Sequence, residues 1–563
     1  MQMVRGGGAT LSWPGTLGVL AGCGAMLFAA AAAEPDARRA RSAQVLAATT
    51  PARNVGVPVR GAVRLKMVGR HRHGSFGKSA AEISAYDSAS RRLFVVNAEV
   101  SGIDVLDISA PAQPKLVRRV ELTAYGKPNS VAAHGGRIAV ALSANPLQDP
   151  GHLVWLDAEG TVLRAVTVGP QPDMVTISPD GRWALTANEG EPSDDYTRDP
   201  EGSVSLVDLT GGVQQLTQAS VTTLGFEAFH DRSKLDPSIR IYGPGASVMQ
   251  DLEPEYIAVS PDSRTAWVSL QEANALAIVD IPTRRITRLV GLGFKDHSRP
   301  ENALDPSDLD GGPRLGTWPV RGMYQPDAIR AFASGGELFV LTANEGDHRK
   351  YGAYNEEARV ADLKLDPRAF PNADELVRPE NLGRLLVTRS LGDADGDGQH
   401  EALYSLGGRS FSVRSAAGEL LYDSGSDFER ITAERHPESF NADQENNDRD
   451  TRSDNKGPEP EGITVGRVDG RDLAFIGLER HSGVMVYDLA NPRRPEFVDY
   501  ILTRDFAAPP EQPEAGDIGP EGLLFIGAQE SPTGRPLLVV SYEISGTTTL
   551  YEVTTDGTLA SDP

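Results

Sequence analysis

Residues 171–189 read QPDMVTISPDGRWALTANE, and the apolar run SVSLVD follows at 203–208. The stretch opens with a proline and an acidic residue, passes through a Ser-Pro-Asp-Gly turn and contains short apolar segments. Proline fixes φ in such a turn, and aspartate and glycine tolerate the turn geometry. The apolar segments are rich in Val, Ile and Leu and are therefore typical of half-buried β-strands. This unit decides the fold because it recurs along the chain.

Each copy of the unit has an acidic or Pro-acidic start and an apolar strand that ends in an acidic residue. Clear copies begin at positions 82, 171, 253, 325, 460 and 520. Degenerate copies occupy 127–156 and 403–424, so the chain contains about eight units. Repetition of a four-strand pattern at this length predicts an all-β protein, a β-propeller of seven or eight four-stranded blades.

The two ends of the repeat region complement each other. The last unit, residues 523–553, contains three strands and lacks a fourth, whereas residues 63–68 form a strand without a repeat partner. We expect this N-terminal strand to supply the missing outer strand and close the ring, which would leave no exposed sheet edge. The propeller is therefore predicted to span 59–555, with 556–563 as a tail.

The N-terminus is interpreted as an export signal. Residues 1–33 contain a weakly apolar run and an Ala-x-Ala pattern, which is typical of a signal peptide that is cut near Ala33. Residues 34–58 then form a linker. A second interpretation is lipidation of Cys23, because Leu-Ala-Gly-Cys resembles a bacterial lipobox. Elsewhere no apolar run approaches the ~20 residues of a membrane span. We therefore expect a secreted or periplasmic protein without a transmembrane segment, or alternatively one that is lipid-anchored at the cell envelope.

The composition favours cations as partners. The chain has 78 Asp and Glu residues against 55 Lys and Arg residues, which gives a formal net charge of −23. Such a surface repels phosphate backbones, so nucleic acid is not an expected partner. The alternative explanation is that the charge only keeps an exported protein soluble. The single cysteine lies outside the predicted propeller, so neither a disulfide nor a thiolate site is expected there. We expect a monomer.

The strongest local motif is the acidic loop 393–401, DADGDGQHE. Its alternating oxygen-bearing side chains, with glycine at the sixth position, match the first half of an EF-hand calcium loop. Ca²⁺ takes roughly six to eight oxygen ligands, so clustered carboxylates on a tight turn suit it. The twelfth position is Tyr404 rather than Glu, and we expect flanking strands rather than helices. The predicted calcium ligands are Asp393, Asp395, Asp397, Gln399 and Glu401; the alternative is a polar surface turn.

Two further sets of acidic residues occupy equivalent positions in the repeats. Equivalent positions of a propeller lie on circles about its axis, so each set predicts an acidic ring near one mouth of the channel. The first ring comprises Glu99, Glu189, Glu272, Glu345, Glu479 and Glu543. The second comprises Asp173, Glu255, Asp327, Glu461 and Glu521. Facing carboxylates repel each other unless a cation or an arginine intervenes. Each ring is therefore interpreted either as a site for a divalent cation or cationic ligand, or as capping of neighbouring blades.

Classical catalytic motifs are missing from the sequence. It contains no GxSxG, no HExxH and no P-loop, so the catalytic residues are unknown and no organic cofactor is predicted. The polar loop 441–457 is interpreted either as a solvated loop over the channel mouth or as a source of ligands such as Asp443, Asn446 and Asp454. Arg409 or Arg480 would be the basic neighbours of the ring in an enzyme.

Three longer motifs carry a resemblance to a known family. The sequences SDNKGPEPEG at 453–462, LTANEGD at 341–347 and LGGRSFS at 406–412 resemble the choice-of-anchor I family. This family is related to the mesenchyme-specific cell-surface glycoproteins of biomineralising animal cells. The resemblance implies an extracellular or surface propeller that is attached by differing anchors, and some relatives carry alkaline-phosphatase labels. No C-terminal sorting motif follows Val553, so any anchor is expected to be the N-terminal lipid.

These observations together predict an exported cell-envelope propeller that binds calcium and an extracellular ligand. The alternative is a calcium-dependent phosphoric-ester hydrolase, similar to an alkaline phosphatase or a propeller phytase. In that alternative, bound metal ions would bring the phosphate group to an otherwise repulsive acidic face and polarise it. Whether the protein is an enzyme stays open at this point.

Overall fold

The computed structural model describes residues 63–555. The predicted signal peptide, the linker, Cys23 and the tail at 556–563 lie outside the described residues. Strands dominate the described part of the chain, and its α-helices are α1 (Val248–Asp251), α2 (Ala373–Leu376) and α3 (Asp427–Arg435). None of the helices within 63–555 is both long enough and apolar enough to cross a membrane.

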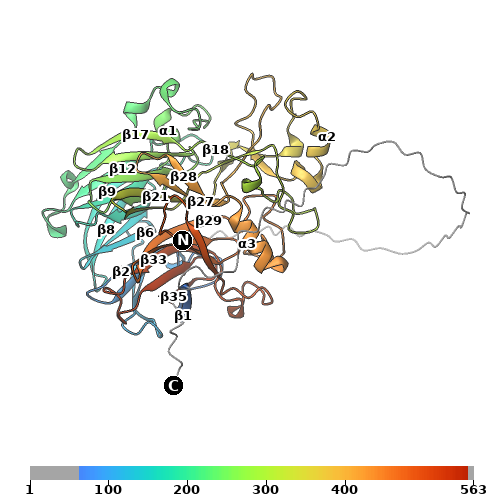
Figure 1. Ribbon diagram of the computed structural model, residues 1–563. Coiled ribbons are helices and arrows are strands. Elements are labelled where there is room, and N and C mark those ends of the chain that lie inside the picture. The colour runs from blue at the N-terminus through green and yellow to red at the C-terminus, as the bar shows by residue number, and fades with distance from the viewer. Residues whose placement is uncertain (1–62, 556–563) are drawn as a thin grey trace, which may run out of the picture. The chain divides into compact units, whose positions relative to one another are not determined.

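Seven four-stranded antiparallel sheets follow one another within residues 63–555 (Figure 1). Six of them use strands in chain order, and the last pairs the two ends of the described chain. The sheets comprise β2–β5 (Ser84–Asp87, Arg92–Asn97, Gly102–Asp107, Lys115–Glu121), β6–β9 (Lys127–His134, Arg137–Ser143, Pro150–Asp157, Val162–Pro170), β10–β13 (Pro172–Ile177, Trp183–Asn188, Ser203–Asp208, Val221–Leu224), β14–β17 (Ile257–Val259, Thr265–Leu270, Ala275–Asp280, Arg285–Gly291), β20, β21, β27 and β28 (Ile329–Ser334, Glu337–Asn344, Ser410–Ser415, Leu420–Asp423), β29–β32 (Pro460–Val468, Arg471–Leu478, Val484–Asp488, Glu496–Ile501), and β33, β34, β35 and β1 (Pro520–Ile526, Leu537–Tyr542, Thr547–Thr555, Val63–Arg72).

The first strands of successive sheets lie against one another. Strand β2 contacts β6, and the contacts continue through β10, β14, β20, β29 and β33, which in turn contacts β2. Apolar side chains fill the spaces between neighbouring sheets; Phe94 of one sheet, for example, packs with Ile138 of the next. Truncation of a fully buried aromatic residue such as Phe475 to alanine typically costs about 3–5 kcal/mol. Such layers hold four-stranded sheets side by side, and the fold is a β-propeller.

The N-terminal strand completes the last sheet, in the position that the sequence predicts. Strand β1 runs antiparallel to β35, with Val63 opposite Thr555 and Arg72 opposite Thr547. Arg70 also forms an ion pair of 2.7 Å with the fully buried carboxylate of Asp517. Residues far apart in the sequence therefore share one sheet.

A long insertion separates β21 from β27. Together with residues that precede β20, it forms a further sheet of five very short strands, which is called the smaller sheet below. This sheet comprises β18 (Phe294–Asp296), β19 (Arg321–Met323), β26 (Tyr404–Ser405), β25 (Leu386–Thr388) and β24 (Glu357–Arg359), and a hairpin of β22 (Lys350–Tyr351) and β23 (Tyr354–Asn355) projects from the same segment. The unit expected at 403–424 is not a separate sheet, because β26 joins the smaller sheet while β27 and β28 complete the sheet of β20. The degenerate unit at 127–156 does form a four-stranded sheet, together with β9.

Candidate metal centre

A repeated turn places one polar side chain at the start of each first strand. Six first strands are entered through an X-Pro-Asp/Glu/Asn segment, as at 171–173 and 325–327. The residue before the proline adopts a left-handed conformation at Gln171, Gln325 and Glu459, with φ of 47°, 42° and 51°. The chain therefore turns sharply into the strand, and the acidic residue after the proline recurs at one place in successive sheets.

The second predicted ring comes together in the structure. All five of its members line one cavity of about 410 Å³. Glu82 lines the same cavity ahead of β2, and Asn129 lines it from β6. Sequence reasoning did not assign Glu82, because its unit lacks the proline, nor Asn129, because it is uncharged. The cavity thus receives one such side chain from each of the seven sheets, and six of these side chains are carboxylates.

The first predicted ring divides between several environments. Glu345 and Glu479 line the cavity. Glu189 is buried beside Asp173 and Glu255, and Glu272 and Glu543 are excluded from most solvent but do not line the cavity. Glu99 is exposed and lies elsewhere, where it accepts hydrogen bonds of 2.9 Å from the backbone N and the Oγ of Ser75. Because Ser75 follows β1 of the neighbouring sheet, Glu99 fits the capping interpretation.

Burial dominates the electrostatics of the cavity. It raises the pKa of Glu82 to about 8 and that of Asp173 to about 6. Burial and the facing carboxylates raise the pKa values of Glu255, Asp327, Glu461 and Glu521 well above the ordinary range. The charge of Glu521 is one cause of the raised pKa of Glu461. Facing carboxyl groups with raised pKa values keep their protons to higher pH unless a cation neutralises them. The cavity therefore holds protons or cations rather than a full set of bare charges.

Three basic side chains line the same cavity, namely Lys127, Lys456 and Arg480. Lys456 Nζ lies 2.5 Å from Glu345 Oε1 and 3.0 Å from Glu459 Oε2. Arg480 lies 2.9 Å from Glu459 Oε2. Although burial opposes ionisation, Lys456 and Arg480 hold the pKa of Glu459 well below its usual range. Part of the acidic wall is therefore neutralised by the protein's own cations.

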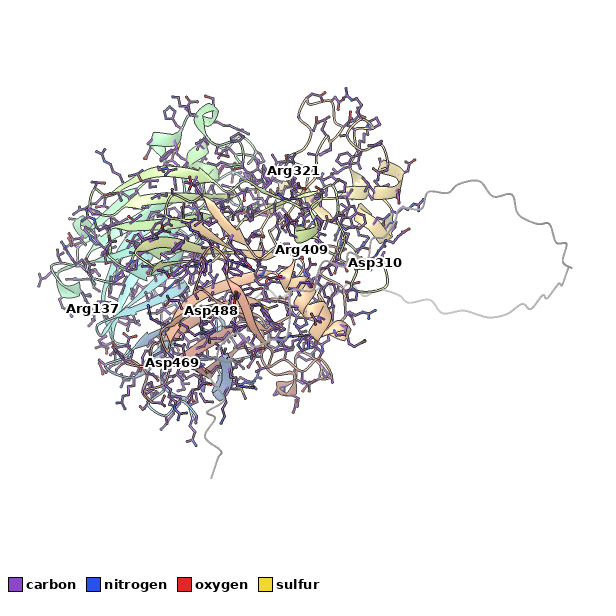
Figure 2. All side chains as sticks on the ribbon, viewed as in Figure 1. Arg137, Asp310, Arg321, Arg409, Asp469 and Asp488 are labelled. Atoms are coloured by element: carbon purple, nitrogen blue, oxygen red, sulfur yellow. The ribbon has the colours of Figure 1, made fainter. Side chains whose placement is uncertain are left out.

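Of the two arginines proposed as basic neighbours, Arg480 lines the cavity and Arg409 does not. Arg409, labelled in Figure 2, donates hydrogen bonds of 2.8 Å to the Asp305 carbonyl and 2.7 Å to Glu429 Oε1. It is almost fully buried. Arg409 therefore ties α3 to the segment between β18 and β19 of the smaller sheet.

Three groups of carboxylates in this region are close enough to share an ion, and one of them, Glu345–Glu459–Glu479, is the group that Lys456 and Arg480 neutralise. The other two groups each span two neighbouring sheets. Oxygens of Asp173, Glu189 and Glu255 lie within 4.8 Å of one another, and so do oxygens of Asp327, Glu345 and Glu461. Ligand oxygens that surround one Ca²⁺ at about 2.4 Å are separated by at most about 4.8 Å. Each of these two groups combines one residue of the first predicted ring with two of the second. Sequence reasoning treated the rings separately and missed this combination.

The predicted calcium loop lies between β25 and β26, flanked by strands as expected. Oxygens of Asp393, Asp395 and Glu401 lie within 4.8 Å of one another. Asp393 accepts backbone hydrogen bonds of 2.7 and 2.9 Å from the loop, which hold the turn closed. Asp397 instead accepts hydrogen bonds from the backbone and side-chain nitrogens of Gln399. Three of the five predicted ligands are therefore clustered, and two pair with each other.

The polar loop 441–457 contributes a cation rather than the anticipated ligands. Asp454 pairs with Arg384 at 2.6 Å, and Asp443 lies 3.7 Å from Arg452. The residue of this loop that lines the cavity is Lys456. A further cluster, which sequence reasoning missed because its members come from separate segments, comprises Asp305, Asp310 and Asp450.

The sequence itself matches a known domain. The choice-of-anchor I domain matches residues 82–492, which run from just before β2 to just after the end of β31. The chain belongs to the choice-of-anchor I family. Two curated relatives are similar to it: Gigasin-3a of Magallana gigas is 35% identical over 31% of this chain and 64% of its own. The mesenchyme-specific cell surface glycoprotein of Strongylocentrotus purpuratus is 26% identical over 47% of this chain and 38% of its own. The chain thus matches less than two thirds of either relative's length.

Solved structures resemble this family member only distantly. Hydrazine synthase of Kuenenia stuttgartiensis has 12% identity and a TM-score of 0.45, over 86% of this chain and 98% of that one. The β-propeller domain of Cps50 (Swd1) from Myceliophteria thermophila has 11% identity and a TM-score of 0.41, over 87% of this chain and 100% of that domain. Streptogramin B lyase has 10% identity and a TM-score of 0.41, over 88% of this chain and 98% of that one.

Proposed function

We propose that this choice-of-anchor I protein is an exported, calcium-binding β-propeller that presents a ligand site outside the cytoplasm. Its seven sheets would be the blades of one ring, closed by β1. The observation that carries the proposal is the cavity itself: six blades each contribute a half-buried carboxylate to one space of about 410 Å³. Carboxylates are hard oxygen ligands, and Ca²⁺ is the common extracellular ion that prefers them.

The proposed location rests on the family and on the sequence. One relative is, by its name, a cell surface glycoprotein, and the N-terminal residues are typical of a signal for export. We propose secretion or release to the periplasm after cleavage near Ala33, with a lipid at Cys23 as the alternative anchor. A calcium-rich extracellular medium would saturate sites of even modest affinity.

A calcium titration with a loop-disabled variant tests the proposal. The variant D393N/E401Q removes two carboxylates from the calcium loop without touching the cavity. Isothermal titration of the chelator-treated full chain should reveal at least two bound ions in the wild type and at least one in the variant. Calcium at a hundredfold excess over Kd should add about 2.7 kcal/mol to the free energy of unfolding. A variant that binds no calcium at millimolar concentration would refute a cavity site.

A second candidate function is calcium-dependent hydrolysis of a phosphoric ester. The observation that favours it is the presence of Lys127, Lys456 and Arg480 in the same cavity as the carboxylates. Bound calcium would polarise a phosphoryl oxygen, and a basic side chain would attract the ester. Turnover of a generic phosphomonoester that requires Ca²⁺ and is lost in E521Q would establish this activity. A rise in melting temperature without turnover would leave calcium as a structural or ligand-binding ion.

A further inference from the structure

Two places on the ring are built from the same local framework. The sequence TANEGE at 186–191 corresponds to TANEGD at 342–347. Asn188 accepts a hydrogen bond from Thr186 at 2.8 Å and donates to the hydroxyls of Ser203 and Ser205. The equivalent Asn344 makes the same set of contacts with Thr342, Ser410 and Ser412. These buried asparagines fix both backbones alike, so the acidic residue that follows, Glu189 or Glu345, leaves the strand in the same way.

The equivalence extends to the carboxylates around these two residues. Asp173 corresponds to Asp327 in the turn that enters the same sheet. In the following sheet, the segment Glu-Pro-Glu at 253–255 corresponds to Glu-Pro-Glu at 459–461. The groups Asp173–Glu189–Glu255 and Asp327–Glu345–Glu461 are therefore two copies of one three-carboxylate arrangement.

One copy already has a cation built into it. The ammonium group of Lys456 lies 2.5 Å from Glu345 Oε1, 2.5 Å from the Gly346 carbonyl and 3.0 Å from Glu459 Oε2. An ammonium group has three protons to donate, and these three oxygens can accept all of them. Lys456 thus neutralises Glu345, whereas Asp327 and Glu461 of the same copy form no ion pair within residues 63–555.

Among the described residues, the other copy has no cation bonded in this way: Lys127 lines the cavity and attracts Asp173, but it forms no ion pair with it. In this copy, the position equivalent to Lys456 is Gln250, whose side-chain amide donates to the Asp199 carbonyl at 2.7 Å. In the Glu-Pro-Glu segment at 253–255, Arg349 forms an ion pair of 2.6 Å with the first residue, Glu253, and none with Glu255. Within residues 63–555, no Lys, Arg or His forms an ion pair with Asp173, Glu189 or Glu255. Glu191, which follows Glu189 closely, adds a fourth carboxylate, held by the Tyr351 hydroxyl at 2.8 Å.

A further oxygen next to this second copy has no partner. Gln171 is only 8% exposed, and its Nε2 donates to both Glu189 and Glu191. Its Oε1, on the same amide carbon, is buried and accepts no hydrogen bond from any residue within 63–555. The repeat-equivalent Gln325 differs, since its Oε1 accepts the Gly407 backbone N–H at 3.2 Å. The amide group of Gln171 thus contacts Glu189 of this copy, and its buried oxygen is of the type that a hard divalent ion prefers.

We infer that Asp173, Glu189, Glu255 and the Oε1 of Gln171 hold one divalent cation, which neutralises Glu189 as Lys456 neutralises Glu345 in the equivalent copy. The inference rests on the proposed calcium-binding function and assigns its cavity ion to one side of the ring. The cavity then has two unlike halves: one is closed by an internal ammonium group, and the other binds a metal ion. The metal-bound half would be the one that offers an exchangeable position to an external ligand.

Matched substitutions of equivalent residues test this assignment. The measurement is calcium titration of the full chain that carries D393N/E401Q, with Tb³⁺ luminescence as a second probe of the same site. E189Q should weaken calcium binding at least tenfold, because it removes a charge from the ligand set. E345Q should change it by less than about threefold, because Lys456 rather than a metal ion faces Glu345. E99Q, at the exposed glutamate outside the cavity, serves as the control for a change of charge alone.

The variant K456Q provides a test in the opposite direction. Loss of the ammonium group should open the Glu345 copy, and the number of ions bound in the cavity should rise from one to two. Equal loss of binding in E345Q and E189Q, or unaltered binding in E189Q, would overturn the assignment while calcium binding by the cavity stands. Absence of any calcium binding in the loop-disabled parent would instead overturn the proposed function itself. If K456Q does not fold, the comparison of E189Q with E345Q decides.

Discussion

Burial is the largest cause of the raised pKa values among the carboxyl groups that the first strands contribute to the cavity. Burial raises the pKa of Glu82 to about 8, while Lys127 opposes the shift and Glu543 and Asp173 add to it. A glutamate in the unfolded chain ionises near pH 4. At pH values between these two pKa values, Glu82 keeps a proton in the native state that it has lost in the unfolded state. The stability supplied by this proton is complete below about pH 4 and disappears as pH rises through about 8.

The metal-free protein should therefore become less stable as pH rises through this range. We expect the free energy of unfolding in chelator to fall by on the order of 2 kcal/mol through Glu82 alone. E82Q keeps a neutral side chain at every pH and should flatten the decline. Thermal melts at closely spaced pH values compare the two proteins, with E99Q as the charge control. Parallel curves for wild type and E82Q would show that Glu82 does not carry a raised pKa.

At the scale of elements, the pairing of β1 with β35 joins the two ends of the described chain. Val63 of β1 is 2% exposed and packs in the apolar layer that also contains Phe475 and Val540. Loss of β1 would remove this contact, leave the buried Asp517 without Arg70, and expose the edge of β35. An exposed edge is a template for pairing with another chain.

A chain that begins at residue 73 should melt several degrees below one that begins at residue 59. It should also associate at high concentration, because the unpaired edge of β35 is free to add a strand. Differential scanning calorimetry and light scattering measure the two effects. The chain from residue 59 keeps β1 and is the matched control. Equal melting temperatures for both chains would show that β1 contributes little to the last sheet.

At the scale of the whole molecule, both the net negative charge and the carboxylates of the cavity affect the stability of the fold. The chain has a formal net charge of −23, and self-repulsion of this size destabilises a compact state. Monovalent salt screens such repulsion within about 10 Å at 0.1 M. Calcium bound in the cavity would neutralise the half-buried carboxylates directly, whereas monovalent salt only screens them.

Sodium chloride should therefore raise the melting temperature of the chelator-treated protein between about 0.02 and 0.5 M. The increase should be smaller once calcium is bound, because part of the repulsion has already been removed. Thermal melts at matched ionic strength, with and without calcium, measure the difference. A melting temperature that falls with salt would indicate that the protein's ion pairs outweigh its repulsion.

The sequence by itself determined the repeating framework. The Pro-acidic turns, the apolar strands and the position of the second ring are all set by short-range patterns, which dictate local conformation wherever they recur. The pairing of the N-terminal strand with the last unit also followed, because an unmatched strand and an incomplete sheet require each other. The acidic loop between two strands was also predictable from its local sequence.

Only the tertiary structure decided to which sheet each strand belongs and which cation pairs with each carboxylate. The insertion before β27 separates two halves of one sheet, so residues 403–424 looked like a unit of their own. Glu345 and Lys456 are 111 positions apart, and nothing in the local sequence pairs them. The difference between that neutralised cluster and the one at Glu189 arises from contacts between distant segments. Local patterns fix conformation, whereas neutralisation of buried charge depends on what the folded chain brings within a few ångströms.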